Sequence, residues 1–475
     1  MIKKWLLILV ISLFAFAGKP PRINGFFIQP MLGYGIPDYT GKFGNQQYYD
    51  NWVKSMADIG ATMLFYQWVG HYEENQTWYS NAYGGAASAD FFYYEPNLNV
   101  ISGIPIQSWM PAIINWTQSN VSPIERVLNA GAKNGVKIWL GLYLSEKGQF
   151  NWWNAVNNND ISASDSATFR YHVERSVDLV QDLARKYGNH EGLGGFYYPI
   201  EIANLGFERR ENWDLLAWIL DSVAVETHKA SGKRLAISPF FNTRLTPAQE
   251  WGEMWDYVLA NSAIDIIMLQ DGVGVEPQTL TQTTDLISPY FKALRDACAK
   301  NGKSFWANAE LFTNTSGRRD SMAMTPSSIE KILLQKNTLA EFADTFVNFS
   351  FMSLDPFVEN VGFNGFSLSA RQKLYNDYKA YYDSIKNIPT AIGGTQRPKS
   401  TLKNHQISVS GNRITLPKFD KAVSYSLISP NGKVILSGIS EGGKTITAPS
   451  ATGIYILMLN VGTQTQIKQK IFLQN

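Results

Sequence analysis

The sequence predicts a (β/α)8 barrel followed by a small β-sandwich. Strand-like and helix-like runs alternate over residues 22–388, and eight strand-like runs are each followed by a helical run. Eight such units over about 360 residues match the count and the upper size range of this barrel. After residue 388 the pattern changes to short alternating runs separated by turn residues. A doubly wound open sheet stays open as an alternative, because periodicity does not distinguish a closed sheet from an open one.

The expected strands of the first part are short apolar runs bounded by turn residues. They span residues 23–29, 61–68, 136–143, 194–204, 234–241, 264–270, 304–310 and 345–351. The expected helices span residues 46–59, 123–132, 164–187, 212–229, 246–261, 287–300, 327–342 and 370–386. Ser122 predicts a helix N-cap before Pro123, and Thr246 with Gln249 predicts a capping box. The helix at 287–300 is expected to run past Pro289 and to end at Asn301-Gly302.

Two long connections are rich in aromatic residues. Residues 71–121 are too polar and too rich in Gly and Asn for core, so we expect a functional loop. We expect Trp78, Trp109, Trp152 or Trp153 to line a cleft and stack on sugar rings, whose C–H faces pack against aromatic planes. Anchoring of the loops to the barrel by these tryptophans is the equally weighted alternative.

Composition excludes several classes of function. The chain has 475 residues, 45% of them hydrophobic, and a formal net charge of +2, which gives no support for a nucleic-acid partner. Cys298 is the single cysteine, so no internal disulfide can form. The five histidines show no paired spacing, so we expect neither a metal nor a cofactor. A monomer is expected.

The two ends of the chain predict export. Residues 1–17 have a basic start, an apolar run and a small-x-small ending, as in a secretory signal peptide. Residues 389–402 are predicted to be a linker. Residues 403–475 carry seven short strand-like runs, which predict a β-sandwich. The protein is therefore expected to be secreted or held at the outer cell surface.

Three carboxylates stand at the carboxyl ends of expected strands: Glu201, Asp271 and Glu310. Reactive groups of a barrel of this kind lie at these strand ends. Glu201 lies between Ile200 and Ile202, which favours a partly dry site and a raised pKa. Paired carboxylates in an aromatic cleft suit glycoside hydrolysis. A buried ion pair or a strand-end cap is the alternative for each acid, most of all for Asp271.

Polar and aromatic side chains near the same strand ends are expected to bind the substrate. They are Gln29, Gln67, Trp68, Tyr143, Trp152, Trp153, Asn242, Gln270 and Asn308. Because side chains alternate along a strand, Asn308 shares a face with Glu310. We expect it to support Glu310 in the ionised state.

Four motifs carry a resemblance to a known family. They are Tyr197-Tyr-Pro-Ile-Glu201, Ile237-Ser-Pro-Phe240, Leu269-Gln-Asp-Gly-Val-Gly274 preceded by Asp265, and Trp306-Ala-Asn-Ala-Glu-Leu-Phe312. With them, residues 26–381 resemble a family of bacterial barrel domains of unassigned function regarded as relatives of glycoside hydrolases. The acids of strands four and seven are also similar to the acid/base and the nucleophile of clan A glycosidases. That resemblance implies acid/base Glu201 and nucleophile Glu310. Ile200 departs from it, because the clan usually has asparagine there.

The last part of the chain is similar to the C-terminal sorting domains of type IX-secreted proteins. The matching segments are residues 429–434, 452–457 and 468–474. This resemblance implies secretion machinery as a partner. A carbohydrate-binding sandwich is disfavoured, because residues 403–475 contain no tryptophan.

The predicted function is therefore a secreted, metal-independent glycoside hydrolase that acts on a polysaccharide or oligosaccharide. Carboxyl groups of Glu201 and Glu310 about 5–5.5 Å apart would give retention, and Glu201 with Asp271 at about 6.5–9.5 Å would give inversion. Retention is favoured. The alternative is a non-catalytic carbohydrate-binding barrel, which ion pairs of the acids with Arg209, Arg210 or Arg244 would favour.

Overall fold

The computed structural model describes most of the chain between residues 21 and 473. The described residues are 21–29, 31–32, 35–36, 45–74, 88–97, 121–145, 163–204, 209–275, 280–318, 323–358, 365–386, 407–416, 423–428, 434–440, 444–448, 453–461 and 465–473. They belong to two compact units that divide between residues 388 and 389. The expected signal peptide and linker lie outside the described residues. Within the described part, no helix is long and apolar enough to cross a membrane.

The first unit contains a closed barrel of eight parallel strands. Its strands are β1 (Gly25–Ile28), β4 (Met63–Tyr66), β7 (Lys137–Gly141), β9 (Leu193–Tyr198), β10 (Leu235–Ile237), β11 (Ile266–Gln270), β12 (Ser304–Glu310) and β15 (Phe346–Phe349). β1 pairs with both β4 and β15, which closes the sheet. The predicted barrel is therefore confirmed, and the open sheet is excluded.

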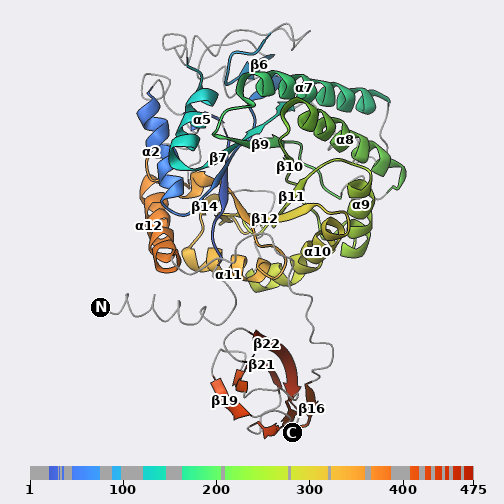
Figure 1. Ribbon diagram of the computed structural model, residues 1–475, viewed down its shortest axis with the longest axis vertical. Helices are drawn as coiled ribbons and strands as arrows, with labels where there is room; N and C mark the ends of the chain where they lie inside the picture. The colour runs from blue at the N-terminus through green and yellow to red at the C-terminus, as the bar shows by residue number, and fades with distance from the viewer. Residues whose placement is uncertain are drawn as a thin grey trace. The chain divides into compact units, whose positions relative to one another are not determined.

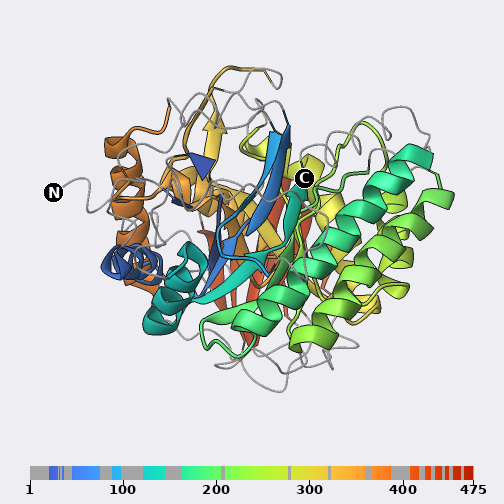
Figure 2. The same ribbon diagram turned by 90° about the horizontal axis from the view of Figure 1, so that it is seen from above.

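In the described part of the first unit, eight helices surround the barrel (Figure 1). They are α2 (Gln46–Ala57), α5 (Pro123–Asn134), α7 (Ala163–Tyr187), α8 (Glu211–Ser231), α9 (Ala248–Ala260), α10 (Leu280–Lys300), α11 (Ile329–Leu339) and α12 (Leu368–Ile385). Figure 2 shows α7 and α8 side by side along the outside of the sheet. Ser122 caps α5 as predicted, because its hydroxyl accepts the N–H of Glu125 at 3.2 Å.

Two helix starts differ from the prediction. The capping box at Thr246 is wrong: Pro247 occupies the N-cap of α9 without a side-chain cap, and Gln249 donates to Glu253 instead. The helix begins one position too late for the hydroxyl of Thr246, which is buried without a hydrogen-bond partner. α10 begins at Leu280, earlier than the expected residue 287, and continues through Pro289.

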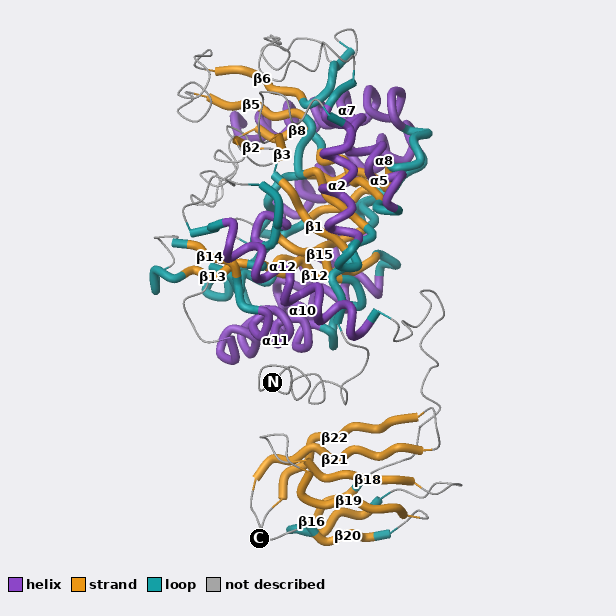
Figure 3. The backbone as a smooth tube through the Cα atoms, turned by 90° about the vertical axis from the view of Figure 1, so that its left-hand side faces the viewer, coloured by secondary structure: helices purple, strands orange, loops and turns teal. Residues whose placement is uncertain are grey.

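Additional strands extend the barrel on one side. β5 (Gly70–Glu74), β6 (Ser88–Phe92) and β8 (Tyr143–Ser145) form one small sheet, β2 (Met31–Leu32) pairs with β3 (Gly35–Ile36), and β13 (Phe312–Asn314) pairs with β14 (Met324–Pro326). All three lie on the same side of the barrel in Figure 3. Phe92, Tyr93 and Tyr94 are buried, so the expectation that residues 71–121 add nothing to the core is wrong.

Aromatic side chains fill the barrel. Phe27 stacks on Phe65 at 4.9 Å between ring centroids, and Phe65 stacks on Trp139 at 5.3 Å. Tyr197 packs edge-on against Phe27 at 5.1 Å. Met268, Trp306 and Val347 belong to or pack against the same cluster. These side chains form an apolar floor beneath the carboxyl ends of the strands, and polar groups above such a floor are partly removed from water.

The second unit has two antiparallel sheets. β16 (Ser408–Ser410), β17 (Arg413–Thr415) and β20 (Thr445–Thr447) form one, and β19 (Val434–Ser440), β18 (Val423–Ile428), β21 (Gly453–Val461) and β22 (Thr465–Leu473) form the other. Buried residues from both sheets, among them Ile414, Leu427 and Leu457, share one apolar core. This arrangement agrees with the seven-stranded sandwich expected from the sequence.

Candidate active site

The three predicted acids lie at the carboxyl-terminal rim of the barrel. Asp271 directly follows β11, Glu310 is the last residue of β12, and Glu201 comes shortly after β9. The strands of the barrel are all parallel, so their carboxyl ends share one rim. The structure therefore places the three carboxylates at the rim where barrels of this kind carry reactive groups.

Glu201 is half-buried above the aromatic floor. Its neighbours Ile200 and Ile202 are both buried, which holds the backbone of Glu201 against the barrel. Burial raises the pKa of Glu201, and a hydrogen bond with Gln270 partly opposes that rise. The charge of Glu201 in turn contributes to the raised pKa of Tyr197 in the floor, after burial. Glu201 is therefore a carboxyl group that holds its proton more tightly than one in water.

Glu310 is held by the loop that follows β11. Its Oε2 accepts the backbone N–H groups of Gly274, at 2.5 Å, and Val275, at 3.2 Å. The side chain is 7% exposed, and burial, followed by the charge of Asp271, raises the pKa of Glu310 to about 8. The two N–H groups favour the charged form but do not offset these effects. Glu310 therefore holds its proton more tightly than a carboxyl group in water.

Asp271 is tied to protein groups through both oxygens. Oδ1 accepts the N–H groups of Val273 at 3.2 Å and Glu310 at 3.1 Å, and Oδ2 accepts the side-chain amide of Gln335. The residue is 2% exposed, and burial raises its pKa to about 6. These contacts are those of a strand-end cap, the alternative that the sequence left open for this acid.

Asn308 does not contact Glu310, so the expectation that its amide supports Glu310 is wrong. Its Nδ2 donates to the hydroxyl of Ser238 at 2.9 Å, and Gln270 donates to the carbonyl of Ser238 at 2.9 Å. The amide of Asn308 is therefore directed toward the residue that follows β10. Oδ1 of Asn308 and Oε1 of Gln67 are buried without a hydrogen-bond partner. Such atoms are rare and often mark functional positions.

The remaining predicted substrate-binding residues differ in burial and in their contacts. Gln29 is half-buried after β1, and Trp68 is buried after β4. Tyr143 is 1% exposed and packs on His172 at 5.8 Å, so its ring is enclosed by protein. Asn242 exchanges two hydrogen bonds with Asn204 and therefore organises its own loop. Trp78, Trp109, Trp152 and Trp153 lie outside the described residues.

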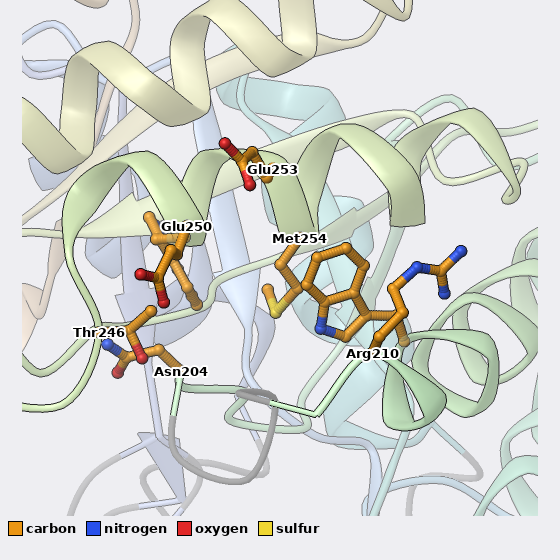
Figure 4. A pocket seen from close by; sticks show the side chains of 8 residues that line it. Asn204, Arg210, Thr246, Glu250, Glu253 and Met254 are labelled. Carbon is orange, nitrogen blue, oxygen red and sulfur yellow. The ribbon is translucent and has the colours of Figure 1, made fainter.

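A separate cavity lies between the loops that follow β9 and β10. It has a volume of about 240 Å³ and is lined by Asn204, Arg210, Thr246, Glu250, Glu253 and Met254, together with two tryptophans (Figure 4). None of the three strand-end acids lines it. The cavity is therefore distinct from the carboxylate site, although Asn204 belongs to the same loop as Glu201.

Chemically, the rim combines carboxyl groups, amides and an apolar floor. Among the described residues, no three His, Cys, Asp or Glu side chains gather closely enough to hold a metal ion. Carboxyl groups whose pKa values are raised by burial, as those of Glu201 and Glu310 are, can act as proton donors and acceptors. The arrangement is thus suited to acid–base and nucleophilic chemistry by carboxylates.

Sequence patterns did not identify the residues that hold Glu310. Gly274 stands out in the sequence only as part of a motif, and Lys331 and Gln335 fall within the expected helix 327–342 with nothing to distinguish them. The spacing of Lys331 and Gln335, four residues apart on α11, places them on one helix face. That spacing is common on exposed helix faces as well, so it was no usable signal.

Comparisons with known proteins identify the fold and the family. A candidate alpha-L-fucosidase from Bacteroides thetaiotaomicron is 16% identical with a TM-score of 0.51, and the match covers 77% of this chain and 95% of that one. An endo-beta-1,4-mannanase from Thermotoga petrophila is 10% identical with a TM-score of 0.47, covering 96% and 98%. No curated protein matches. Residues 23–357 match the family described as "Domain of unknown function (DUF4434)", and the chain belongs to that family.

Proposed function

We propose that the protein is a glycoside hydrolase that acts on a polysaccharide or oligosaccharide. The observation that carries this proposal is the placement of Glu201 and Glu310 at one rim of a closed barrel, above an aromatic floor. A solved structure with the same fold is named as a candidate alpha-L-fucosidase, which supports the same class of reaction. The signal-like N-terminus and the similarity of residues 403–475 to sorting domains support an exported enzyme.

In the proposed mechanism, Glu201 is the acid/base and Glu310 the nucleophile. Glu201 protonates the glycosidic oxygen as that bond breaks, a role suited to a carboxyl group whose pKa is raised by burial. Ionised Glu310 attacks the anomeric carbon and forms a glycosyl-enzyme. Glu201 then takes a proton from the water that hydrolyses this intermediate. Two displacements at the same carbon retain its configuration.

The contacts of Glu310 fit a nucleophile that must be held still. The described hydrogen bonds of its carboxyl group all go to Oε2, from the N–H groups of Gly274 and Val275. Oε1 is therefore the oxygen that is available for attack. The same two N–H groups stabilise the carboxylate when it leaves the anomeric carbon in the second displacement.

Non-catalytic binding of carbohydrate is the competing function. A binding role predicts ion pairs between the strand-end acids and nearby arginines. Arg210 instead pairs with Asp214 at 3.5 Å. Asp271 and Glu310 make no ion pair within the described part of the chain. Two desolvated carboxyl groups without a paired cation are costly in a binding protein, and this cost favours the enzyme.

The proposal is tested by incubating the purified chain with a panel of plant, fungal and bacterial polysaccharides and measuring released reducing ends. Hydrolysis of at least one polysaccharide is expected from the wild type and from Glu253→Gln, which alters an exposed acid in the separate cavity. Hydrolysis should disappear in a Glu201→Gln, Glu310→Gln double variant. Equal product from the double variant would show that another site, or a contaminant, is responsible.

A pH profile should report the ionisation of Glu310 directly. In Glu201→Gln, Glu310 is the reacting carboxyl group that still titrates, and an aryl glycoside with an activated leaving group needs no acid. Because only ionised Glu310 attacks, the rate of the first displacement, measured as kcat/KM or as the burst rate, is expected to rise with pH through an apparent pKa near 8. Well below that value, each pH unit should change the rate by about tenfold. A rate that falls as the pH rises through 8 would instead make Glu310 the proton donor.

A further inference from the structure

Two side chains on one face of α11 donate hydrogen bonds to the segments that follow β11 and β12, next to Asp271 and Glu310. Nζ of Lys331 donates to Thr313 Oγ1 at 2.9 Å, to the carbonyl of Val273 at 3.3 Å and to that of Phe312 at 3.5 Å. One helical turn later, Gln335 donates to Asp271 Oδ2 and to the carbonyl of Glu310 at 3.3 Å. Two residues of a single helix thus link the ends of β11 and β12.

The carboxylate of Asp271 completes this link. It accepts the N–H of Val273 in its own loop and the N–H of Glu310 on the neighbouring strand. The chain then turns so that the next two N–H groups, those of Gly274 and Val275, meet Oε2 of Glu310. Each contact depends on the one before it, because the direction of an N–H group is set by the backbone that carries it.

Gly274 shows how closely this loop approaches the carboxyl group. A Cβ atom at this position would lie 2.7 Å from Oε2 of Glu310 and 2.9 Å from the carbonyl oxygen of Phe312. Both distances are shorter than any ordinary carbon–oxygen contact. The absence of a side chain at Gly274 is therefore required for its N–H group to bind Glu310.

We infer that Lys331, acting with Gln335 and Asp271, is a positioning residue that holds the loop donors and a positive charge around Glu310. This inference deepens the proposed function and rests on it for the catalytic role of Glu310. Lys331 makes no hydrogen bond to Glu310, and its contacts are all to the loops. It acts by fixing the 273–275 turn and by favouring the ionised carboxylate electrostatically.

The charged groups around Glu310 come from two elements besides its own strand. Asp271, at the end of β11, opposes ionisation of Glu310, and Lys331 on α11 favours it. Lys336, also on α11, is fully buried, donates to Asn348 at 2.9 Å and acts on Asp271. Burial lowers the pKa of Lys336 to about 7, so this lysine loses much of its charge above neutral pH. Burial also lowers the pKa of Lys331, but the charges of Asp271 and Glu310 oppose that shift and favour its charged form.

The inference is tested by replacing Lys331 with methionine, with Lys303→Met as the matched control. Lys303 is also half-buried and donates to a backbone carbonyl, that of Ser262 at 2.9 Å, but it precedes β12 and thus lies at the opposite end of the strand. In the Glu201→Gln background, Lys331→Met should shift the apparent pKa of the activated-substrate profile upward by about one unit. The rate at pH 7 should fall about tenfold. Lys331→Arg, which keeps the charge, should retain the wild-type pKa.

A second measurement needs no substrate. The pKa of Glu310 is raised on folding, so its contribution to stability is fully present below the unfolded pKa and is lost as the pH rises through about 8. The free energy of unfolding is measured in denaturant at several pH values for the wild type and for Glu310→Gln. The difference between the two isolates the contribution of Glu310. The same difference is then measured between Lys331→Met and the Lys331→Met, Glu310→Gln double variant. There the stability contribution of Glu310 should persist to higher pH, whereas in the Lys303→Met background it should be lost at the wild-type pH.

The two measurements separate the possible failures. If the stability contribution of Glu310 is lost at the same pH in Lys331→Met as in the wild type, the role of Lys331 is overturned. A lowered rate whose pH profile has not moved also overturns it, because a purely structural residue would give that result. A loss shifted to higher pH in a chain that hydrolyses nothing in the panel supports the positioning of Glu310 and contradicts the proposed enzyme instead.

Discussion

Glu310→Gly is expected to abolish hydrolysis, and added azide is expected to restore turnover. Removal of a catalytic nucleophile costs roughly 10⁴–10⁶-fold in rate, because no other group can form the covalent intermediate. Glycine leaves a space beside the N–H groups of Gly274 and Val275, which bound Oε2 in the native protein. A small anion can occupy that space and attack the anomeric carbon in place of the carboxylate.

The product and a matched variant make this experiment decisive. Azide attacks once, so the glycosyl azide should have the configuration opposite to that of the substrate. Glu310→Gln should be equally inactive without rescue, because its amide fills the space that azide needs. Undiminished hydrolysis by Glu310→Gly would rule out Glu310 as the nucleophile, and rescue with the same configuration would contradict retention.

Glu201→Gln is the variant with the second-largest expected effect. The amide keeps the size of the side chain but cannot donate a proton to the leaving group or accept one from water. General acid–base catalysis contributes about 10²–10⁴-fold, so the rate on a natural glycoside should fall by that amount. An aryl glycoside with an activated leaving group needs little protonation, and its first displacement should be nearly unaffected.

Dependence on the leaving group is therefore the measurement that identifies Glu201. Pre-steady-state kinetics with the activated substrate should show a burst of released phenol followed by slow hydrolysis of the glycosyl-enzyme. Glu253→Gln provides the control, because Glu253 is an exposed acid that lines the separate cavity. An equal loss of rate for activated and natural substrates would count against Glu201 as acid/base and would indicate a binding role.

Local sequence patterns were sufficient for the barrel and for the place of its acids. Apolar runs such as residues 264–270 and 304–310 had the length of strands, and each preceded a helical run. Parallel strands in a closed barrel end at one rim, so an acid at the end of such a run is placed by its position in the chain. Glu201, Asp271 and Glu310 could therefore be predicted to share that rim before any contact was known.

Closure of the sheet and the surroundings of each acid were decided by tertiary structure. The pairing of β1 with β15 joins residues more than 300 positions apart, and no local period encodes it. Asn308 shares a face with Glu310 in the sequence pattern but donates to Ser238, which follows another strand, β10. Thr246 had the spacing of a capping box, yet Pro247 took the cap position.

Contacts between residues distant in the chain also make the surroundings of the three acids different. In the sequence all three are strand-end carboxylates, and only flanking residues and a family resemblance distinguish them. In the folded chain, Gln335, 64 residues beyond Asp271, binds Asp271, and the loop at Gly274 binds Glu310. Glu201 instead stands above the aromatic floor. The sequence by itself determined which rim carries the carboxylates. Only the tertiary structure decided which of them are enclosed by N–H groups and how strongly each holds its proton, because desolvation and hydrogen bonding depend on neighbours distant in the chain.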